Sequence, residues 1–433
     1  VTLAEAPPRA PVEPPRRGSA WALLRLAVVV ATVVALFLLL GWGPLLVVIV
    51  AVVVMVMVHE LGHFATAKWS HMKVTEYFVG FGPRLWSIRR GETEYGVKAI
   101  PAGGYVKIPG MTNLEEIDPA DEARTYRQQP FRNRILVACA GSFMHFVMAF
   151  LLAYGAVLYF GVLTSVRVPV ASFVTWPGHQ QTAAQQAGLQ KGDVIVAIDG
   201  RRLDSATAVL HVVNRSPGKP LALTVRRDGH LLHMTVTPAV GHYTAGGQEK
   251  LGPGKASQKT VGLIGFAPGQ PVGVYSPEGP VRALGTSVVD VGRDTALTVR
   301  SVPAAIGALY DSVTSSKAAQ QSARTGTRPE SIVGAVRTAT QAEQSGVLYL
   351  IEILIALNIA FGLLNMLPML PLDGGHVAIA VYERTRTRRG RPSYQADAAK
   401  LLPVVYVFSA VLVVVVVSAL YLDIVHPVAN PFQ

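Results

Sequence analysis

The sequence contains few charged residues and almost no cysteine. Only 15% of its 433 residues are Asp, Glu, Lys or Arg, whereas an average soluble domain has about 25%. With half of the residues hydrophobic, this scarcity of charge argues against a disordered chain and against an ordinary soluble enzyme. The single cysteine, Cys139, excludes an intrachain disulfide framework and a multi-cysteine zinc or iron–sulfur site. We therefore expect a chain that lies partly in lipid and partly in water.

Long apolar runs predict five transmembrane helices. The run at 21–58 holds two spans, because one helix needs about 20 residues to cross the hydrocarbon core, and the Gly and Pro residues at 41–44 mark the break. Further apolar runs lie near 135–161, 347–367 and 401–422. No clear small-x-small cleavage site follows the first span, so we expect it to be an anchor and not a signal peptide.

The net charge of +12 is explained by topology. Basic residues gather in 68–134 and in 383–400, and five spans place both segments on the same side as the basic N-terminal tail. The positive-inside rule makes that side cytoplasmic and the long segment 165–340 external. No motif or stacking pattern favours nucleic acid as a partner.

Segment 168–268 is predicted to be a compact β-rich module. Val194–Ile198 is a short buried-strand run, and two alternating runs meet at Asp228-Gly229, which is a strong hairpin signal. The stretch 187–200 resembles the signature of bacterial PDZ domains, which implies a groove that accepts peptide ends or extended segments by strand addition. A small β domain without a ligand is the alternative.

Two segments follow the predicted module. Residues 241–260 are rich in Gly, Lys, Gln and Ser and are expected to form a flexible loop. Apolar residues at near-helical spacing predict an amphipathic helix at 279–302. Such a helix lies near the membrane or packs on the β module, and the sequence leaves both open.

The second apolar run ends in an H-E-x-x-H motif. On a helix, His59 and His63 share one face, so both imidazoles can reach one metal ion, and Glu60 can act as general base on a metal-bound water. These polar groups are costly in a lipid-length helix unless they are paired or line a wet cavity. Thr66 and Trp69 stand where the extended metzincin pattern has Gly and His, which excludes that class.

The best candidate for a third ligand is Asp373, at the end of the fourth apolar run. Pro368 and Pro371 break the helix there, and backbone freed at membrane depth must be buried or line a cavity. Gly374 and Gly375 allow a close backbone approach. A zinc ion with ionised Asp373 and Glu60 has no net charge, which lowers the cost of burying the cluster.

With these two motifs, the chain resembles the site-2 protease family of intramembrane zinc metalloproteases over about residues 44–425. The resemblance implies that His59, His63 and Asp373 bind zinc and that Glu60 is the catalytic acid/base. It also implies that Asn365 helps to bind the substrate backbone. Strand-like stretches within 81–108 are similar to the family's β-sheet, which dips toward the active site and pairs with the substrate.

Within the family, the chain is most similar to bacterial members that cleave anti-sigma factors. This implies a protein of the bacterial cell membrane whose substrates are single-pass membrane proteins already clipped by a first protease. The active site is expected near the cytoplasmic side, and the PDZ domain is expected to be extracytoplasmic. Membrane lipid is the other expected partner, and the oligomeric state is left open.

The expected fold class is a polytopic α-helical membrane protein with about five transmembrane helices, a membrane-associated β-hairpin region and an extracytoplasmic PDZ domain. Its expected segments are a disordered basic tail (1–20), an additional N-terminal span (21–43), a span with H-E-x-x-H (44–68), a cytoplasmic or re-entrant β region (69–134), a span (135–163), the PDZ domain (168–268), a linker with an amphipathic helix (269–345), a span with Asp-Gly-Gly (346–376), a basic loop (377–400) and a last span (401–422).

Two other functions compete with proteolysis. A membrane scaffold would use the metal structurally, and a structural zinc site is usually closed by four protein ligands without a poised base. His145, where the family commonly has Asn, is the candidate fourth ligand, although a hydrogen-bonded helix histidine is the favoured interpretation. A transporter with broken helices would call for an inverted repeat, and we see none in the sequence.

Overall fold

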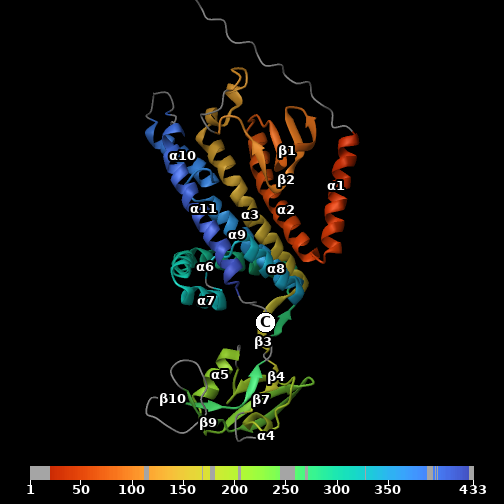
Figure 1. Ribbon diagram of the computed structural model, residues 1–433, viewed down its shortest axis with the longest axis vertical. Helices are drawn as coiled ribbons and strands as arrows, with labels where there is room; N and C mark the ends of the chain where they lie inside the picture. Colours follow the sequence, from red (N-terminus) through yellow and green to blue (C-terminus); the bar gives the residue numbers. More distant parts are fainter. Residues whose placement is uncertain are drawn as a thin grey trace, which may run out of the picture. The chain divides into compact units, whose positions relative to one another are not determined.

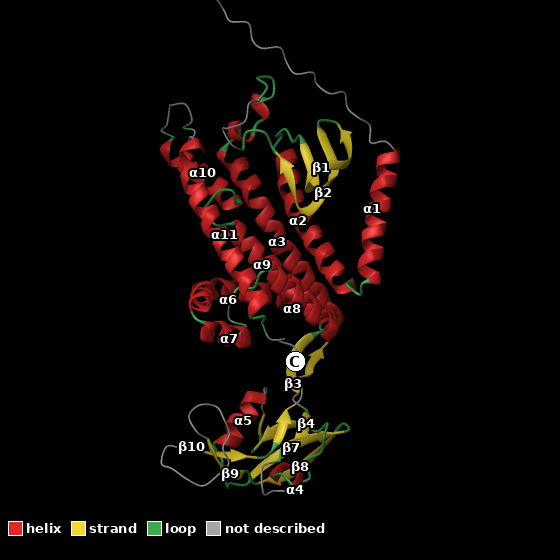
Figure 2. Cartoon of the chain, viewed as in Figure 1, coloured by secondary structure: helices red, strands yellow, loops and turns green. Residues whose placement is uncertain are grey.

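The computed structural model divides the chain into two compact units. One comprises Val1–Ala156 with Leu284–Pro431, and the other comprises Val157–Ala283 with the last two residues (Figures 1 and 2). All but the last residue of the predicted tail, all but five residues of the predicted 241–260 loop, and part of the predicted basic loop lie outside the described residues. The structure describes residues 20–111, 117–167, 169–175, 181–202, 206–243, 259–268, 272–326, 328–387, 394, 396 and 398–428.

Five helices of the first unit form the membrane part. They are the described helices long and apolar enough to cross a bilayer, so the chain is a multi-pass membrane protein. Gly41, with φ of +71°, separates the first two, where the sequence predicted the break. The five are α1 (Ala20–Leu39), α2 (Gly43–Trp69), α3 (Phe131–Phe160), α9 (Val347–Asn365) and α11 (Leu402–Val425).

Small residues bring α2 and α3 together. A Cβ on Gly62 would lie 2.7 Å from the carbonyl oxygen of Ala140, so only glycine permits this approach. Near the end of α2, a buried cluster that includes Ala67, Tyr126 and Val137 joins α2, the turn before α3 and α3 itself. This contact fixes the end of α2 that carries the H-E-x-x-H motif.

A twisted β region lies against the end of α2 and consists of β1 (Glu76–Arg90) and β2 (Thr93–Lys107). Glu76 is opposite both Glu94 and Lys107, so the first part of β1 lies between the two halves of β2. The chain turns between the two strands at residues 91 and 92, with φ of +62° at Gly91. Two short 3₁₀ turns, Glu122–Arg124 and Tyr126–Gln128, lead into α3.

The fourth span differs from the predicted segment 346–376. Helix α9 ends at Asn365, a non-helical stretch follows, and α10 (Asp373–Arg386) begins at the predicted metal ligand. The expected loop at 377–400 is therefore helical up to residue 386. The prolines end α9, as the sequence predicted, but an Asp in the first turn favours a new helix start because it complements the helix dipole.

Three further helices precede α9 in the first unit. The predicted amphipathic helix is present and longer than expected, as α6 (Pro280–Thr314), and is followed by α7 (Ser316–Thr325) and α8 (Ile332–Ser345). The turn between α7 and α8 is anchored to α11, because the buried Arg328 donates to Asp423 Oδ1 at 3.1 Å and the Ser331 amide donates to Asp423 Oδ2 at 2.6 Å.

The second unit is built from small antiparallel sheets. Its largest sheet has four strands in the order β6-β5-β7-β8, around a core that includes Val209, Leu223 and Val236. The predicted strand and hairpin are confirmed, and the hairpin turns at Asp228 and Gly229, both with positive φ. Its elements are β3 (Val162–Arg167), β4 (Val170–Phe173), α4 (Ala183–Gln186), β5 (Val194–Ile198), β6 (Arg201–Arg202), α5 (Ala206–Asn214), β7 (Leu221–Arg227), β8 (His230–Val236), β9 (Ala239–Tyr243), β10 (Lys259–Leu263), β11 (Phe266–Pro268) and β12 (Val272–Ser276).

Candidate metal centre

Three potential metal ligands from two distant parts of the chain meet in one cluster. Among the described residues, His59, His63 and Asp373 are the group of three or more His, Cys, Asp or Glu side chains placed to hold a metal ion. His63 Nε2 lies 3.3 Å from His59 Nε2 and 3.3 Å from Asp373 Oδ2, and His59 Nε2 lies 3.5 Å from Asp373 Oδ2. The structure therefore brings together the ligand set that the sequence predicted.

These distances fit a tetrahedral zinc site. Ligand atoms about 2.0–2.1 Å from a zinc ion at tetrahedral angles are about 3.3–3.4 Å from one another, which matches the observed triangle. Both imidazoles are buried, with exposed fractions of 7% for His59 and 5% for His63. Two imidazole nitrogens and a carboxylate oxygen are a donor set that zinc takes, so the residues present fit zinc.

The tautomer of His63 is set by a second contact. Its Nδ1 lies 2.7 Å from the carbonyl oxygen of Val137 on α3. Because a carbonyl only accepts, Nδ1 carries the proton and donates it, which leaves the Nε2 lone pair free to bind a metal. Such a backbone partner both orients a ligating histidine and raises its basicity.

Gly141 on α3 makes room for the cluster. A Cβ at this position would lie 2.7 Å from His59 Nε2 and closer still to His63 Nε2. Any other residue would therefore occupy the space into which the two imidazole nitrogens point. The adjacent Ser142 Oγ lies 3.4 Å from Asp373 Oδ2. No local sequence pattern marks Gly141, because the importance of this glycine depends on a neighbouring helix.

Two glycines position Asp373. A Cβ on Gly374 would overlap the carbonyl oxygens of Met366 and Leu367, and one on Gly375 would lie 2.5 Å from the Leu370 amide nitrogen. The non-helical stretch after α9 thus folds directly onto the first turn of α10. The predicted close backbone approach at these glycines is confirmed, and it holds the carboxylate at the start of a helix.

Glu60 lies beside the β region. Its Oε2 accepts a hydrogen bond of 3.0 Å from the Val106 amide of β2. Gly104, two residues earlier on β2, also lies against α2. A Cβ at this position would lie 2.6 Å from Met57 Sδ and 3.8 Å from Glu60 Cγ. The carboxylate is therefore held next to the ligand pair but is not one of the three clustered ligands. No sequence signal identified the Val106 amide as its partner.

His145 and Asn365 differ in how closely they approach the cluster. The His145 ring centroid lies 5.0 Å from that of His59, but its nitrogens are not part of the three-ligand group. Its Nδ1 pairs instead with Oδ1 of the buried Asn358 on α9, at 3.2 Å. Asn365 is half-buried at the end of α9, and its predicted role toward the substrate stays a prediction. Asn358, which makes this interhelical bond, belongs to no motif and was not predicted from the sequence.

Comparison with known proteins places these residues in context. The sequence matches the sequence model of peptidase family M50 over residues 47–412. It is 32% identical over 406 residues to the zinc metalloprotease Rip1 of Mycolicibacterium smegmatis, covering 86% of this chain and 95% of that protein. It is 33% identical over 399 residues to Rip1 of Mycobacterium tuberculosis H37Rv, with the same coverage. A putative zinc metalloprotease of Rhizobium meliloti is 28% identical over 363 residues, covering 80% and 88%.

Proposed function

The chain belongs to peptidase family M50 and is an intramembrane zinc metalloprotease, and from this premise we propose that it cleaves the transmembrane segments of single-pass membrane proteins. The expected substrates are anti-sigma factors that a first protease has already cut outside the membrane. The observation that carries the proposal is the cluster of His59 and His63 with Asp373, delivered by separate elements beside apolar helices.

The reaction we infer uses Glu60 as a proton carrier. Zinc, when bound by His59, His63 and Asp373, supplies Lewis acidity that polarises a carbonyl and acidifies water. As the water oxygen bonds to the scissile carbonyl carbon, Glu60 takes one proton from that water. It then gives this proton to the amide nitrogen as the C–N bond breaks, which releases an amine and a carboxylic acid. The acid passes the second proton of the water to the amine, so that a carboxylate and an ammonium group remain.

An edge strand of the β region supports the proposal that the substrate is a transmembrane segment. A transmembrane helix hides its peptide bonds in its own hydrogen bonds, so it must be unwound before hydrolysis. In the described pairing, residues 104–107 pair with residues 76–79 of β1, and the Val106 amide of the same segment faces Glu60. We infer that an extended substrate lies along this segment, because main-chain pairing at a sheet edge holds a peptide without requiring a particular sequence. Asn365 is proposed as a further contact to the substrate backbone.

We further propose that the second unit is an extracytoplasmic PDZ domain that admits shortened substrates. Its support is the signature at residues 187–200, the four-stranded sheet and helix α5 within the same unit. The orientation follows from the basic residues of the β region and of α10, which place those segments in the cytoplasm. If deletion of residues 168–268 leaves the preference for clipped over intact substrates unchanged, the gating role is wrong.

The decisive test compares Glu60→Gln with the wild type on a single-pass model substrate in reconstituted membranes. We expect the variant to keep one zinc per chain and to lose cleavage, because the amide cannot accept the proton. Glu352→Gln is the matched control, since Glu352 is an exposed carboxylate on α9, and it should cleave as the wild type does. Undiminished turnover by Glu60→Gln would remove the proposed mechanism.

A further inference from the structure

A cavity lies on α10, beside the helix start that carries Asp373. Its volume is about 340 Å³, which is within the ~300–1,000 Å³ range of ligand pockets. Gly375, Ala378, Ile379 and Tyr382 line it from α10, at the spacing of one helix face. Val404 and its neighbour on α11 close another wall, so the cavity borders a helix that can cross the membrane.

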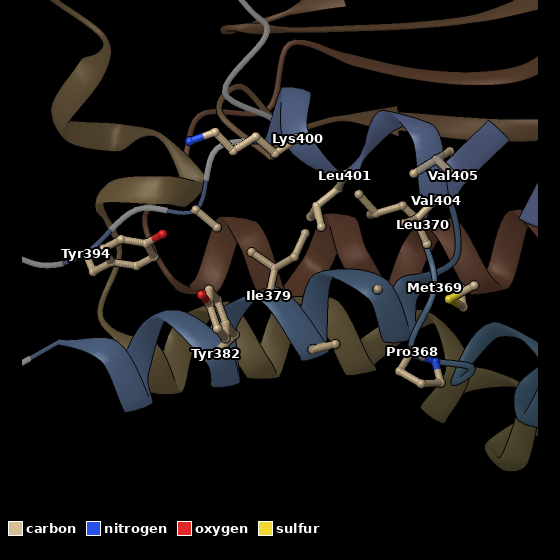
Figure 3. A pocket seen from close by; sticks show the side chains of 13 residues that line it. Pro368, Met369, Leu370, Ile379, Tyr382, Tyr394, Lys400, Leu401, Val404 and Val405 are labelled. Atoms are coloured by element: carbon tan, nitrogen blue, oxygen red, sulfur yellow. The ribbon is translucent and has the colours of Figure 1, made fainter. Parts of the chain in front are cut away.

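The two ends of this cavity differ in polarity. Figure 3 shows Tyr382, Tyr394 and Lys400 at one end and Pro368 and Met369 toward the other. Among the described residues that line the cavity, those two tyrosines and the lysine carry polar side-chain atoms, and the others are apolar. The cavity thus has an apolar body and a polar mouth, which is the polarity profile of a lipid. Tyrosine is also the residue type enriched at membrane–water interfaces.

The polar mouth is cationic. The guanidinium carbon of Arg386 lies 5.8 Å from the ring centroid of Tyr382 and 5.8 Å from that of Tyr394, so a second basic group stands over two lining residues. Arg386 and Lys400 are both exposed, and none of the described lining residues is acidic. Basic pockets next to transmembrane helices are suited to anionic lipid head groups.

We propose that this cavity binds an acyl chain of an anionic phospholipid, with the phosphate at Lys400 and Arg386. The hydroxyls of Tyr382 and Tyr394 can donate to the phosphate or glycerol oxygens. An extended peptide fits less well, because the lining side chains offer hydrogen-bonding groups at one end only and the peptide backbone would be unpaired elsewhere. Because Gly375 lines the cavity two residues after Asp373, a bound lipid packs against the turn that positions this metal ligand.

The test is lipid binding by the full chain in detergent, measured by native mass spectrometry. Dioleoyl phosphatidylglycerol and dioleoyl phosphatidylcholine are the probes. We expect one phosphatidylglycerol per chain, bound about tenfold more tightly than phosphatidylcholine. Ala378→Phe, which fills the cavity, should weaken phosphatidylglycerol binding at least tenfold. Val381→Phe is the matched control, because Val381 lies on α10, is 44% exposed and does not line the cavity, and it should bind as the wild type does.

The charge of the mouth is tested separately. Arg386→Gln should weaken phosphatidylglycerol binding about fivefold, the expected effect of one basic group near a lipid phosphate, and should leave phosphatidylcholine binding unchanged. Arg384→Gln, two residues away on the same helix, is its control and should change binding less than twofold. One zinc per chain in every variant reports that the first unit is folded, independently of protease activity.

Two results would overturn the proposal. One is equal phosphatidylglycerol binding by the wild type, Ala378→Phe and Val404→Phe, which fills the cavity from α11. The other is equal affinity of the wild type for the two lipids, since the site would then not select an anionic head group. If Ala378→Phe loses its zinc, Val404→Phe and Arg386→Gln decide the question.

Discussion

Two aspartates, one in each unit, show how the same side chain can serve either stability or metal binding. Asp193 of the second unit is 1% exposed, and its carboxylate is saturated by its own chain. It accepts from Arg227 Nε at 2.8 Å and Nη2 at 2.7 Å and from the Gln190 amide at 2.7 Å. Asp373 of the first unit faces two imidazole nitrogens and the hydroxyl of Ser142, all 3.3–3.5 Å from its Oδ2.

The difference in their partners distinguishes a carboxylate that stabilises the fold from one that can bind a metal ion. A buried carboxylate with a bidentate guanidinium and a backbone amide has no capacity left for a ligand. A half-buried carboxylate beside two histidines, one of which presents a bare nitrogen, is instead placed to bind a cation together with them. A substitution at one aspartate should therefore affect the metal centre, and the same substitution at the other should affect the stability of the second unit.

The largest effect is expected from removing the Asp373 charge. Asp373→Asn should lower the zinc content at least about tenfold, since even changes to groups behind the ligands cost 10–100-fold, and cleavage should fall to background. Zinc per chain and turnover of the model substrate are the measurements. Asp193→Asn is the control, because the same substitution in the other unit should retain one zinc. A fully metallated, active Asp373→Asn enzyme would contradict the assignment.

A similar loss is expected when the space beside the imidazoles is filled. Gly141→Ala places a Cβ against His59 and His63 and should weaken zinc binding by about 100-fold, measured by competition with a chelator. Gly155→Ala lies on the same helix with nothing within 4 Å and should bind zinc normally. Since alanine favours a helix over glycine by about 1 kcal/mol, a loss at Gly141 alone reflects the site. Equal affinities in both variants would show that the cluster has more room than we infer.

The opposite result, a loss of stability without a loss of zinc, is expected at Asp193. Asp193→Asn should destabilise the second unit by about 2–3 kcal/mol, which is below the ~3–5 kcal/mol for breaking a fully buried pair because Arg227 is partly exposed. Hydrogen exchange in peptides from residues 206–236 should speed up about 30- to 100-fold, while zinc content stays at one per chain. Asp228→Asn, at an exposed turn, should change neither. Unchanged exchange in Asp193→Asn would mean that the ion pair does not hold the unit together.

A lower pH is expected to have a smaller effect on the stability of the second unit. Burial tends to raise the pKa of Asp193, but the Arg227 guanidinium and the Gln190 amide outweigh it, so the pKa lies below its ordinary value. A lowered pKa gives stability that is present above the ordinary value of about 3.9 and is lost as the pH falls below it. The ratio of exchange rates between Asp193→Asn and the wild type should therefore shrink from pH 6 to pH 3. A constant ratio would show that the carboxylate is not ionised in the folded unit at pH 6.

The sequence predicted the parts of the metal centre that local patterns encode. The spacing of His59 and His63 places them on one helix face, and the charge balance with Asp373 pointed to a third ligand more than 300 positions away. The apolar runs likewise indicated the five spans. The start of α10 at Asp373 was missed, because Asp-Gly-Gly after two prolines is equally typical of a turn.

What the sequence could not predict depends on how elements approach one another. The role of Gly141 arises only when α3 crosses α2, and the Val106 amide reaches Glu60 only because β1 splits β2 into two halves. His145 pairs with Asn358 across more than 200 positions. The cavity on α10 also combines residues from four segments, none of which carries a motif.

Zinc K-edge X-ray absorption on the full-length protein tests the central claim most directly, because it reports the atoms bound to the metal. The account predicts two imidazoles at about 2.0–2.1 Å, oxygen ligands from one carboxylate and a water, and no sulfur. A spectrum with three imidazoles, or with one, would contradict the assignment of His59, His63 and Asp373 as the zinc ligands.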